Sequence, residues 1–202
     1  MDYRVGIAGL GAIGMKVAAT LDRGEIKDMR LAAVSAGDLE RAAGRVADFA
    51  NPPAVVEAAA LAENADIVIE CAAKTIFADL ALSVIEAGRI FMPLSVGALL
   101  DHPSLIGRAR ETGARIIVPT GAIIGLDAIR AMAVGKIENV TLETRKPPNG
   151  LAGAPYLVEN NIDVEALTEP MRVFKGTARE AARGFPANVN VAAALSLAGI
   201  GP

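Results

Sequence analysis

The feature that most constrains this chain is the pattern Gly9-Leu10-Gly11-Ala12-Ile13-Gly14, which joins an apolar run to an amphipathic one. The run before it, YRVGIA, is typical of a buried strand, and the run after it, MKVAATL, has helical spacing. A strand, a glycine turn and a helix in this order predict the first βαβ unit of a dinucleotide-binding fold. The alternative is a glycine turn that only lets a strand and a helix pack closely.

Each glycine has its own task in such a unit. Gly9 would allow the tight turn, Gly11 would let a pyrophosphate approach the backbone, and Gly14 would let the helix pack on the strand. The phosphates would bind at the N-terminus of the helix, where backbone N–H groups lack partners. Ala12 and Ile13 belong to that first turn, so they join the glycines as candidate cofactor-binding residues.

Apolar runs alternate with helical patterns over the first 120 residues. Crossovers of this length force parallel pairing, because an antiparallel pair needs only a tight turn. We therefore predict an α/β fold with a doubly wound parallel (Rossmann) sheet in a dinucleotide-binding domain of residues 1–120. The predicted strands are Tyr3–Ala8, Leu31–Ser35, Ile67–Cys71, Ile90–Leu94 and Arg115–Val118, and the predicted helices are Met15–Leu21, Leu39–Phe49, Ile76–Ala87 and Pro103–Thr112.

Ligands of such sheets bind outside the carboxyl ends of the strands, where this chain has the small-residue stretches SAGD, AAKT, SVGA and PTGAIIG. Ala72, in AAKT, is a candidate cofactor-binding residue. Ser35 stands where an NAD site usually has an Asp or Glu that binds the ribose 2′-OH, so both NAD and NADP are admitted. Arg41 lies near this position, and we favour a solvated role for it, paired with Asp38 or Glu40.

The pattern changes after about Gly121. A predicted helix, Leu126–Val134, is followed by a predicted strand, Asn139–Arg145, a Pro/Gly-rich connection, a short strand around Met171–Lys175 and a helix near Val189–Ala198. Two strands make a poor independent sheet. We therefore predict that residues 121–202 form a smaller α+β domain for substrate binding and dimerisation, which is C-terminally incomplete or completed by another chain.

Three residues of this second region are candidate site residues. Ala122, in PTGAIIG, would place a backbone amide near the nicotinamide, or would belong to an interdomain hinge. Asn188, in FPAN, would recognise a carboxamide or a substrate carboxylate, or would cap the following helix. Lys146, in TRKPPNG, would bind an anionic substrate, or would be a solvated strand end.

Composition and single residues exclude several classes of protein. A net charge of −3, with 3% aromatic residues and no Trp, gives no footprint for nucleic acid, and no apolar run is long enough to span a bilayer. The lone Cys71 forms no internal disulfide and is interpreted as a core residue of a cytoplasmic protein. His102, the only histidine, is assigned a capping or surface role, so neither a catalytic triad nor a metal site is expected.

These segments together resemble the L-aspartate dehydrogenase family over essentially the whole chain. The resemblance is carried by GLGAIG, SVGAL, PTGAIIGLDAI, TRKPP and GFPANVNVAAALSLAGIGP. It implies a homodimer that oxidises L-aspartate with NAD or NADP to iminoaspartate, which feeds NAD biosynthesis or hydrolyses to oxaloacetate and ammonia. It also implies that Ala122 and Asn188 contact the nicotinamide and that the glycines bind the pyrophosphate.

The family's catalytic histidine lies downstream of AGIGP, so it is expected beyond Pro202, and His102 is in the wrong domain to replace it. For the chain as written, cofactor binding with weak or absent turnover is expected. Two alternatives remain. One is a reductase similar to homoserine dehydrogenase or dihydrodipicolinate reductase, with Lys146 as the proton donor, and the other is a non-catalytic NAD(P)-binding protein.

Overall fold

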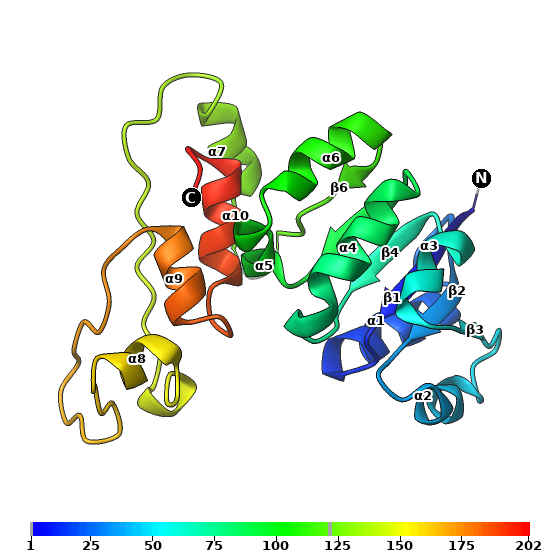
Figure 1. The fold of residues 1–202 in the computed structure, drawn as a ribbon, viewed down its shortest axis with the longest axis horizontal. Coiled ribbons are helices and arrows are strands. Elements are labelled where there is room, and N and C mark those ends of the chain that lie inside the picture. Colours follow the sequence, from blue (N-terminus) through cyan, green and yellow to red (C-terminus); the bar gives the residue numbers. More distant parts are fainter. Residues whose placement is uncertain (1, 121–122) are drawn as a thin grey trace. The chain divides into compact units, whose positions relative to one another are not determined.

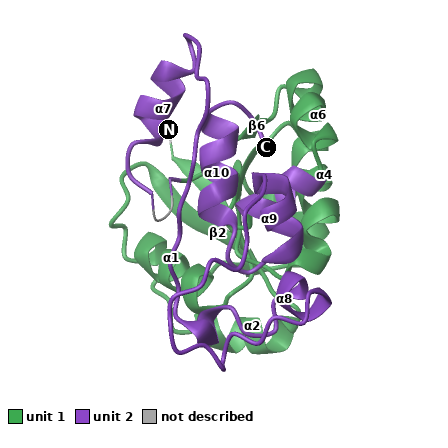
Figure 2. Ribbon diagram, turned by 90° about the vertical axis from the view of Figure 1, so that its left-hand side faces the viewer, with its two compact units in different colours: residues 1–95, 102–119 green, residues 96–101, 120–202 purple. Residues whose placement is uncertain are grey.

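The computed structural model describes residues 2–120 and 123–202. By its internal contacts the chain divides into two compact units, shown in different colours in Figure 2. The first unit comprises residues 1–95 and 102–119, and the second comprises residues 96–101 and 120–202. The predicted division of function between residues 1–120 and 121–202 stays a prediction, and it differs from these units in the segment 96–101.

The first unit is built on one six-stranded sheet in which every pairing is parallel. Its strand order is β3-β2-β1-β4-β5-β6, so the direction of winding reverses between β1 and β4 (Figure 1). This confirms the doubly wound sheet, and the five predicted strands agree with the observed ones to within two residues at each end. The strands are β1 (Tyr3–Ala8), β2 (Met29–Ser35), β3 (Ala54–Val55), β4 (Ile67–Glu70), β5 (Ile90–Pro93) and β6 (Arg115–Ile116).

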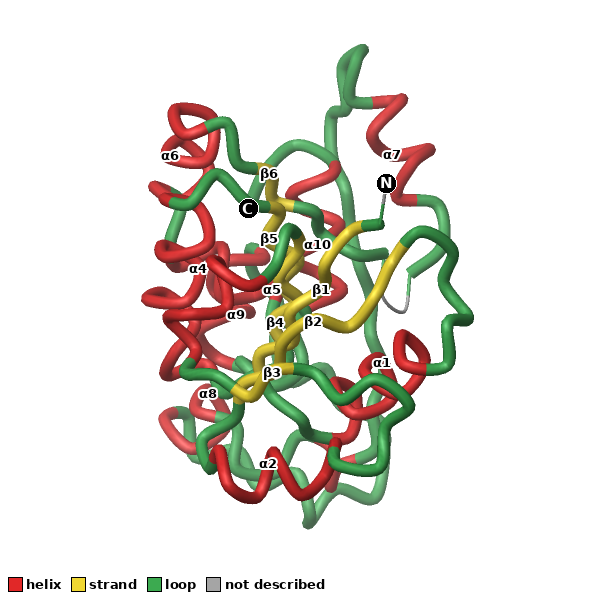
Figure 3. The backbone as a smooth tube through the Cα atoms, turned by 90° about the vertical axis from the view of Figure 1, so that its right-hand side faces the viewer, coloured by secondary structure: helices red, strands yellow, loops and turns green. Residues whose placement is uncertain are grey.

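Helices cover both faces of the sheet. In Figure 3, α1 lies on one face, and α4 and α6 lie on the other. The sequence patterns missed β3, which has only two residues, and the short α3 that precedes β4. The helices of this unit are α1 (Ala12–Asp22), α2 (Leu39–Val46), α3 (Leu61–Asn64), α4 (Phe77–Glu86) and α6 (Ser104–Thr112), with 3-10 turns at Ala58–Ala60 and Lys74–Ile76.

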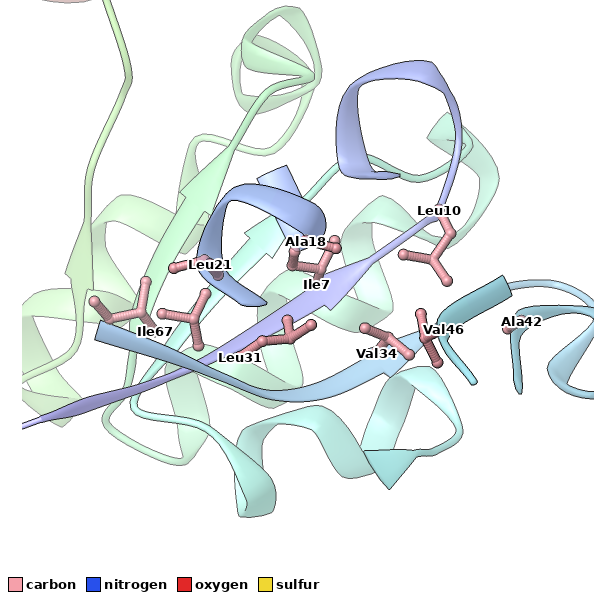
Figure 4. Packing of buried hydrophobic residues seen from close by; sticks show 10 residues of the cluster. Ile7, Leu10, Ala18, Leu21, Leu31, Val34, Ala42, Val46 and Ile67 are labelled. Atoms are coloured by element: carbon pink, nitrogen blue, oxygen red, sulfur yellow. The ribbon is translucent and has the colours of Figure 1, made fainter. Parts of the chain in front are cut away.

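A buried cluster joins β1, β2 and the helices α1 and α2 (Figure 4). Leu10 of the glycine turn is 3% exposed and belongs to this cluster together with Val34 of β2 and Val46 of α2. The turn is therefore anchored through an apolar side chain, since burying a leucine removes its surface from water. The position of the backbone around Gly9 and Gly11 is set by this core.

The second unit consists of helices and irregular segments in the residues that the structure describes. A small core of Leu157, Val164 and Phe185 is surrounded by rings, among them Tyr156 and Phe174, whose centroids lie 5.2 Å apart. Thr177 and Glu180 form a reciprocal capping box at the start of α9. The helices are α5 (Val96–Asp101), α7 (Leu126–Met132), α8 (Pro155–Glu159), α9 (Ala178–Gly184) and α10 (Asn190–Ala198), with a 3-10 turn at Pro148–Gly150.

Helix α5 lies between β5 and α6 in the sequence but packs within the second unit. Gly97 allows this packing, because a Cβ there would lie 2.4 Å from Cγ1 of Val189. The N–H of Gly97 also donates to Oδ1 of Asn190, at 3.1 Å. A residue without a side chain is therefore needed where α5 meets the start of α10.

The predicted strands Asn139–Arg145 and Met171–Lys175 are wrong: neither segment forms a strand, and no described residue of the second unit does. A strand requires a partner that accepts and donates its backbone hydrogen bonds. Residues 141–150 are all exposed instead. The predicted helices Leu126–Val134 and Val189–Ala198 are confirmed, because α7 and α10 lie within these ranges.

Candidate dinucleotide-binding site

The glycine turn connects β1 to α1 and has a conformation that only glycine adopts easily at its first position. Gly9 has φ of +91°, and a Cβ there would lie 2.5 Å from the carbonyl oxygen of Cys71. The N–H of Gly9 donates to the carbonyl of Ser35, at 2.7 Å. The turn therefore packs directly against the segments that leave β2 and β4.

Gly14 and Gly11 have opposite surroundings. Gly14 is buried, and a Cβ on it would lie 1.9 Å from the carbonyl oxygen of Gly9, which no side chain tolerates. Gly11 is exposed, and a Cβ on it would meet no atom within 4 Å. Close helix packing thus explains Gly14, whereas the protein itself gives no steric reason for Gly11. A molecule that approached the backbone at Gly11, as predicted from the sequence, would supply that reason.

The start of α1 offers backbone N–H groups to an anion. Gly11 is the N-cap residue, it provides no side-chain cap, and the first turn carries no acidic residue. Ala12 and Ile13 of that turn are exposed, Ile13 by 60%. Helix N-termini with unpaired N–H groups attract phosphate. Gly11, Ala12 and Ile13 are therefore exposed at the start of α1, whereas Gly9 is half-buried and Gly14 is buried in the same turn.

Arg45 of α2 is a neighbour of this turn that the sequence did not reveal. Its guanidinium donates a hydrogen bond to the carbonyl oxygen of Leu10. An arginine on the exposed surface of a helix gives no sequence signal for such a contact, because the contact depends on how α2 packs beside the turn. The interaction places a positive charge next to the candidate pyrophosphate site.

The end of β2 carries no free carboxylate of the kind that usually binds a ribose. Ser35 is the last residue of the strand and is 3% exposed. Asp38, three residues later, is the N-cap of α2, and its carboxylate accepts the backbone N–H of Arg41 at 2.9 Å. The predicted pairing of Asp38 with the Arg41 side chain is thus replaced by a capping bond.

Ala72 follows β4 and lies against the glycine turn, since its Cα would be 2.9 Å from a Cβ on Gly9. Its N–H donates to Oε1 of Glu70, at 2.9 Å. Glu70 is fully buried, and sequence reasoning missed it. The signal that could have found it is an acidic residue directly after the apolar run Ile67–Ile69, at the carboxyl end of a parallel strand.

Cys71 is confirmed as a packed residue rather than a reactive one. It is packed against the core cluster of the first unit. Burial, and secondarily the negative charge of Glu70, raise the pKa of its thiol to about 11. The thiol is therefore protonated at neutral pH, whereas a nucleophilic cysteine works as the thiolate.

His102 has a structural role, although it does not cap a helix. Its ring stacks on Phe77, with centroids 6.1 Å apart and planes inclined by 23°. The N-cap residue of α6 is Pro103, with no side-chain cap. Across residues 2–120 and 123–202, no group of three or more His, Cys, Asp and Glu side chains is arranged to hold a metal ion.

The remaining predicted site residues belong to the second unit. Ala122 lies outside the described residues. The side chain of Asn188 donates from Nδ2 to the carbonyl of Gly150 at 3.1 Å, so it bridges two segments instead of capping α10, whose N-cap is Val189. Lys146 is exposed, four residues before Gly150. None of the helices in the described part of the chain is long and apolar enough to cross a membrane.

Two protein-family models match the chain. Residues 9–119 match the model described as the NAD-binding domain of homoserine dehydrogenase. Residues 127–202 match the model described as the C-terminal domain of aspartate dehydrogenase. The first match covers the glycine turn and strands β2 to β6, and the second begins within α7 and continues through α10.

Curated relatives align over the full chain. The L-aspartate dehydrogenase of Bradyrhizobium diazoefficiens is 50% identical over 201 residues, which are 100% of this chain and 71% of that protein. L-aspartate dehydrogenase 3 of Bordetella bronchiseptica is also 50% identical over 201 residues and is covered to 74%. The L-aspartate dehydrogenase of Methanocella arvoryzae is 42% identical over 202 residues.

A solved structure has a similar fold. The crystal structure of aspartate dehydrogenase from Thermotoga maritima superposes with a TM-score of 0.67 at 24% identity, covering 98% of this chain and 74% of that one. At 24% identity this match shows the fold alone. The family is shown by the three curated relatives, which are 42% to 50% identical to this chain.

Proposed function

Since the chain belongs to the L-aspartate dehydrogenase family, we propose that its glycine turn holds the pyrophosphate of NAD or NADP during the oxidation of L-aspartate. When bound, the nicotinamide accepts a hydride from Cα of L-aspartate, and the product is iminoaspartate. The residues of this chain contribute by binding and orienting the two reactants.

The observation that carries the proposal is the contrast among the three glycines. Gly9 and Gly14 are needed by the protein's own packing, whereas the space over Gly11 is open. This is the division of tasks expected of a turn that lets a pyrophosphate approach the backbone. The N–H groups of Ala12, Ile13 and Gly14 then lie at the positive end of the α1 dipole, which favours the negative charge of the phosphates.

The 2′ end of the cofactor would lie near Ser35. A hydroxyl can donate to a phosphate or bond to a ribose, and no carboxylate at the end of β2 repels a 2′-phosphate. The carboxylate of Asp38 is engaged in capping α2. These features support the use of either NAD or NADP. Ala72, whose backbone packs on Gly9, would line the same crevice.

We also propose roles for three residues of the second unit. The family resemblance assigns nicotinamide contact to Ala122 and Asn188, and the amide of Asn188 suits a carboxamide or a substrate carboxylate. Lys146 is exposed and suits the negative charge of aspartate. The proton-transferring histidine that the resemblance implies beyond Pro202 stays a prediction.

A substrate panel tests the reaction. The protein is incubated with NAD⁺ or NADP⁺ and L-aspartate, D-aspartate or homoserine, and NAD(P)H formation is followed by absorbance. A parallel assay follows NADPH consumption with dihydrodipicolinate. We expect L-aspartate to give the highest rate. Preference for homoserine or for dihydrodipicolinate would favour the related reductases. Because weak or absent turnover is expected of residues 1–202 alone, nucleotide binding without turnover favours a non-catalytic binding protein only when it is found for a form that includes the family's histidine.

The family resemblance also supports proposals about the oligomeric state, the cellular location and the use of the product. We propose a homodimer that works in the cytoplasm and whose product enters NAD biosynthesis. A free thiol at Cys71 and the pyridine-nucleotide chemistry support the cytoplasmic location. Light scattering coupled to gel filtration tests the dimer, because a mass equal to that of one chain at micromolar concentration would exclude it.

A further inference from the structure

The buried carboxylate of Glu70 lies where the winding of the sheet reverses. In the strand register Glu70 stands beside Ala8 of β1 on one side and Pro93 of β5 on the other. Its relative exposure is 0%. In open α/β sheets, ligands bind in the crevice outside this point. A charged group is therefore buried directly beneath the crevice in which the cofactor would bind.

Three donors from two loops converge on this carboxylate. Oε1 accepts the N–H of Ala72 at 2.9 Å and the hydroxyl of Ser95 at 3.1 Å, and Oε2 accepts the N–H of Ser95 at 3.0 Å. Ala72 is the second residue after β4, and Ser95 is the second residue after β5, directly before α5. One side chain thus holds the beginnings of both loops.

The loop after β4, which Glu70 holds through Ala72, also packs against the glycine turn. Gly9 packs on the backbone of Cys71 and Ala72, because a Cβ at position 9 would lie 2.5 Å from the first and 2.9 Å from the second. The N–H of Cys71 also donates to the carbonyl of Ala8 at 2.8 Å. A shift of Ala72 would therefore move the surface against which the turn is folded.

We propose that Glu70 is a positioning residue for NAD(P), which holds the loops after β4 and β5 and, through Ala72, the glycine turn in the geometry that binds the cofactor. An apolar residue could fill the same space, but it would leave the N–H groups of Ala72 and Ser95 buried without acceptors. Only a carboxylate offers two acceptor atoms and no donor to these three groups. The inference rests on the proposed use of the crevice for NAD(P).

The substitution Glu70→Gln tests this role because it keeps the shape and removes one acceptor. The amide NH2 must face a backbone N–H, that of Ser95 if it replaces Oε2 or that of Ala72 if it replaces Oε1. Neither backbone N–H can turn into an acceptor, so one of the two loops has to move. Glu63→Gln is the matched control, since Glu63 is an exposed glutamate in α3 of the same unit.

The experiment titrates NADH and NADPH into the protein and its variants, with nicotinamide fluorescence as the binding signal and amide NMR spectra as the structural signal. We expect Glu70→Gln to weaken binding by about tenfold or more, while Glu63→Gln binds as the parent does. The amide signals of Ala72 and Ser95 should shift when the parent protein binds NADH, and a residue with a merely structural role does not require that response.

Ser95→Ala is the second variant, for the case in which Glu70→Gln does not fold. It removes only the hydroxyl donor and should weaken binding by a smaller factor, about twofold to fivefold. Parent-like affinity of a folded Glu70→Gln protein, or of Ser95→Ala when Glu70→Gln is unfolded, would overturn the role of Glu70. Failure of the parent protein and of Glu63→Gln to bind either nucleotide would instead overturn the proposed use of the crevice.

Discussion

At the scale of single residues, the glycine turn separates what folding needs from what binding needs. Gly9 and Gly14 are explained by the backbone conformation and by close packing inside the protein. Gly11 has an ordinary extended conformation, with φ of −72° and ψ of −159°, and empty space over it. The functional interpretation of the GLGAIG pattern therefore depends on its middle glycine.

Gly11→Ala should leave folding intact and weaken cofactor binding. A methyl group at position 11 meets no protein atom, but it stands where the pyrophosphate approaches, so we expect NADH and NADPH to bind about tenfold or more weakly. Thermal unfolding, measured beside the fluorescence titration, should be unchanged. A parent-like affinity of Gly11→Ala would show that the turn does not contact the phosphates.

Gly14→Ala is the opposite case. Its Cβ would clash with the carbonyl of Gly9, so we expect a loss of about 1–3 kcal/mol or more in the free energy of unfolding. Gly44→Ala is the control, because Gly44 lies inside α2 with open space around it and should gain up to about 1 kcal/mol. Urea unfolding curves of the three proteins measure both effects.

Ser35→Asp should change the preference for the cofactor. A carboxylate at the end of β2 would repel a 2′-phosphate and could bond a ribose 2′-OH, so NADPH should bind at least about tenfold more weakly while NADH is little affected. Ser35→Asn introduces the same bulk without the charge and controls for the burial of this position. An equal loss for both nucleotides in Ser35→Asp would place the 2′ end elsewhere.

At the scale of elements, the alternation of apolar runs with helical patterns predicted the sheet, because each buried strand in it is a short apolar run between two helical patterns. The same reasoning failed for Asn139–Arg145 and Met171–Lys175, because a strand-like pattern does not specify a partner, and the structure provides none for these segments. Asn188 was found by its setting in FPAN, but its bond to Gly150 could not be predicted, since it joins segments far apart in the sequence.

Glu70 was missed for a related reason. Its role arises from donors on two loops that converge only in three dimensions. The membership of α5 in the second unit is likewise a matter of packing, visible in the sequence only as a glycine at position 97.

The amino-terminal ends of the central strands β1 and β4, opposite the cofactor crevice, carry an ion pair between Arg4 and Asp66 that makes stability depend on pH. The side-chain and backbone donors of Arg4 hold the pKa of Asp66 down to about 2, from 3.8. A lowered pKa in the folded state means that the stabilisation is present above about pH 4 and is lost as the pH falls towards 2. The pair links the start of β1 to the residue before β4.

Asp66→Asn should therefore lower the free energy of unfolding at pH 7 by about 1–2 kcal/mol. The difference between the variant and the parent should shrink as the pH falls from 4 towards 2, because the parent's carboxylate is protonated there. Urea unfolding at several pH values measures it. Glu25→Gln is the control, since the Arg23–Glu25 pair is more exposed and should matter less. A constant difference across this pH range would refute the assignment.

At the scale of the whole molecule, the two family matches divide the chain much as the two compact units do. Residues 9–119, which match an NAD-binding domain, include the glycine turn, Ser35 and Glu70. Residues 127–202, which match the C-terminal domain of aspartate dehydrogenase, include Asn188. Sequence motifs could indicate the family, whereas the contacts that we propose to position the cofactor required the fold.

The central claim is that the chain transfers a hydride from Cα of L-aspartate to a pyridine nucleotide. The most direct measurement mixes the protein, in amounts equal to the coenzyme, with L-aspartate deuterated at Cα and NAD⁺ or NADP⁺, and analyses the reduced coenzyme by mass spectrometry. We predict NADH or NADPH that carries the deuterium, with none formed from D-aspartate. Coenzyme that is reduced without deuterium, or that stays oxidised in a form of the protein that includes the family's histidine, would contradict the account.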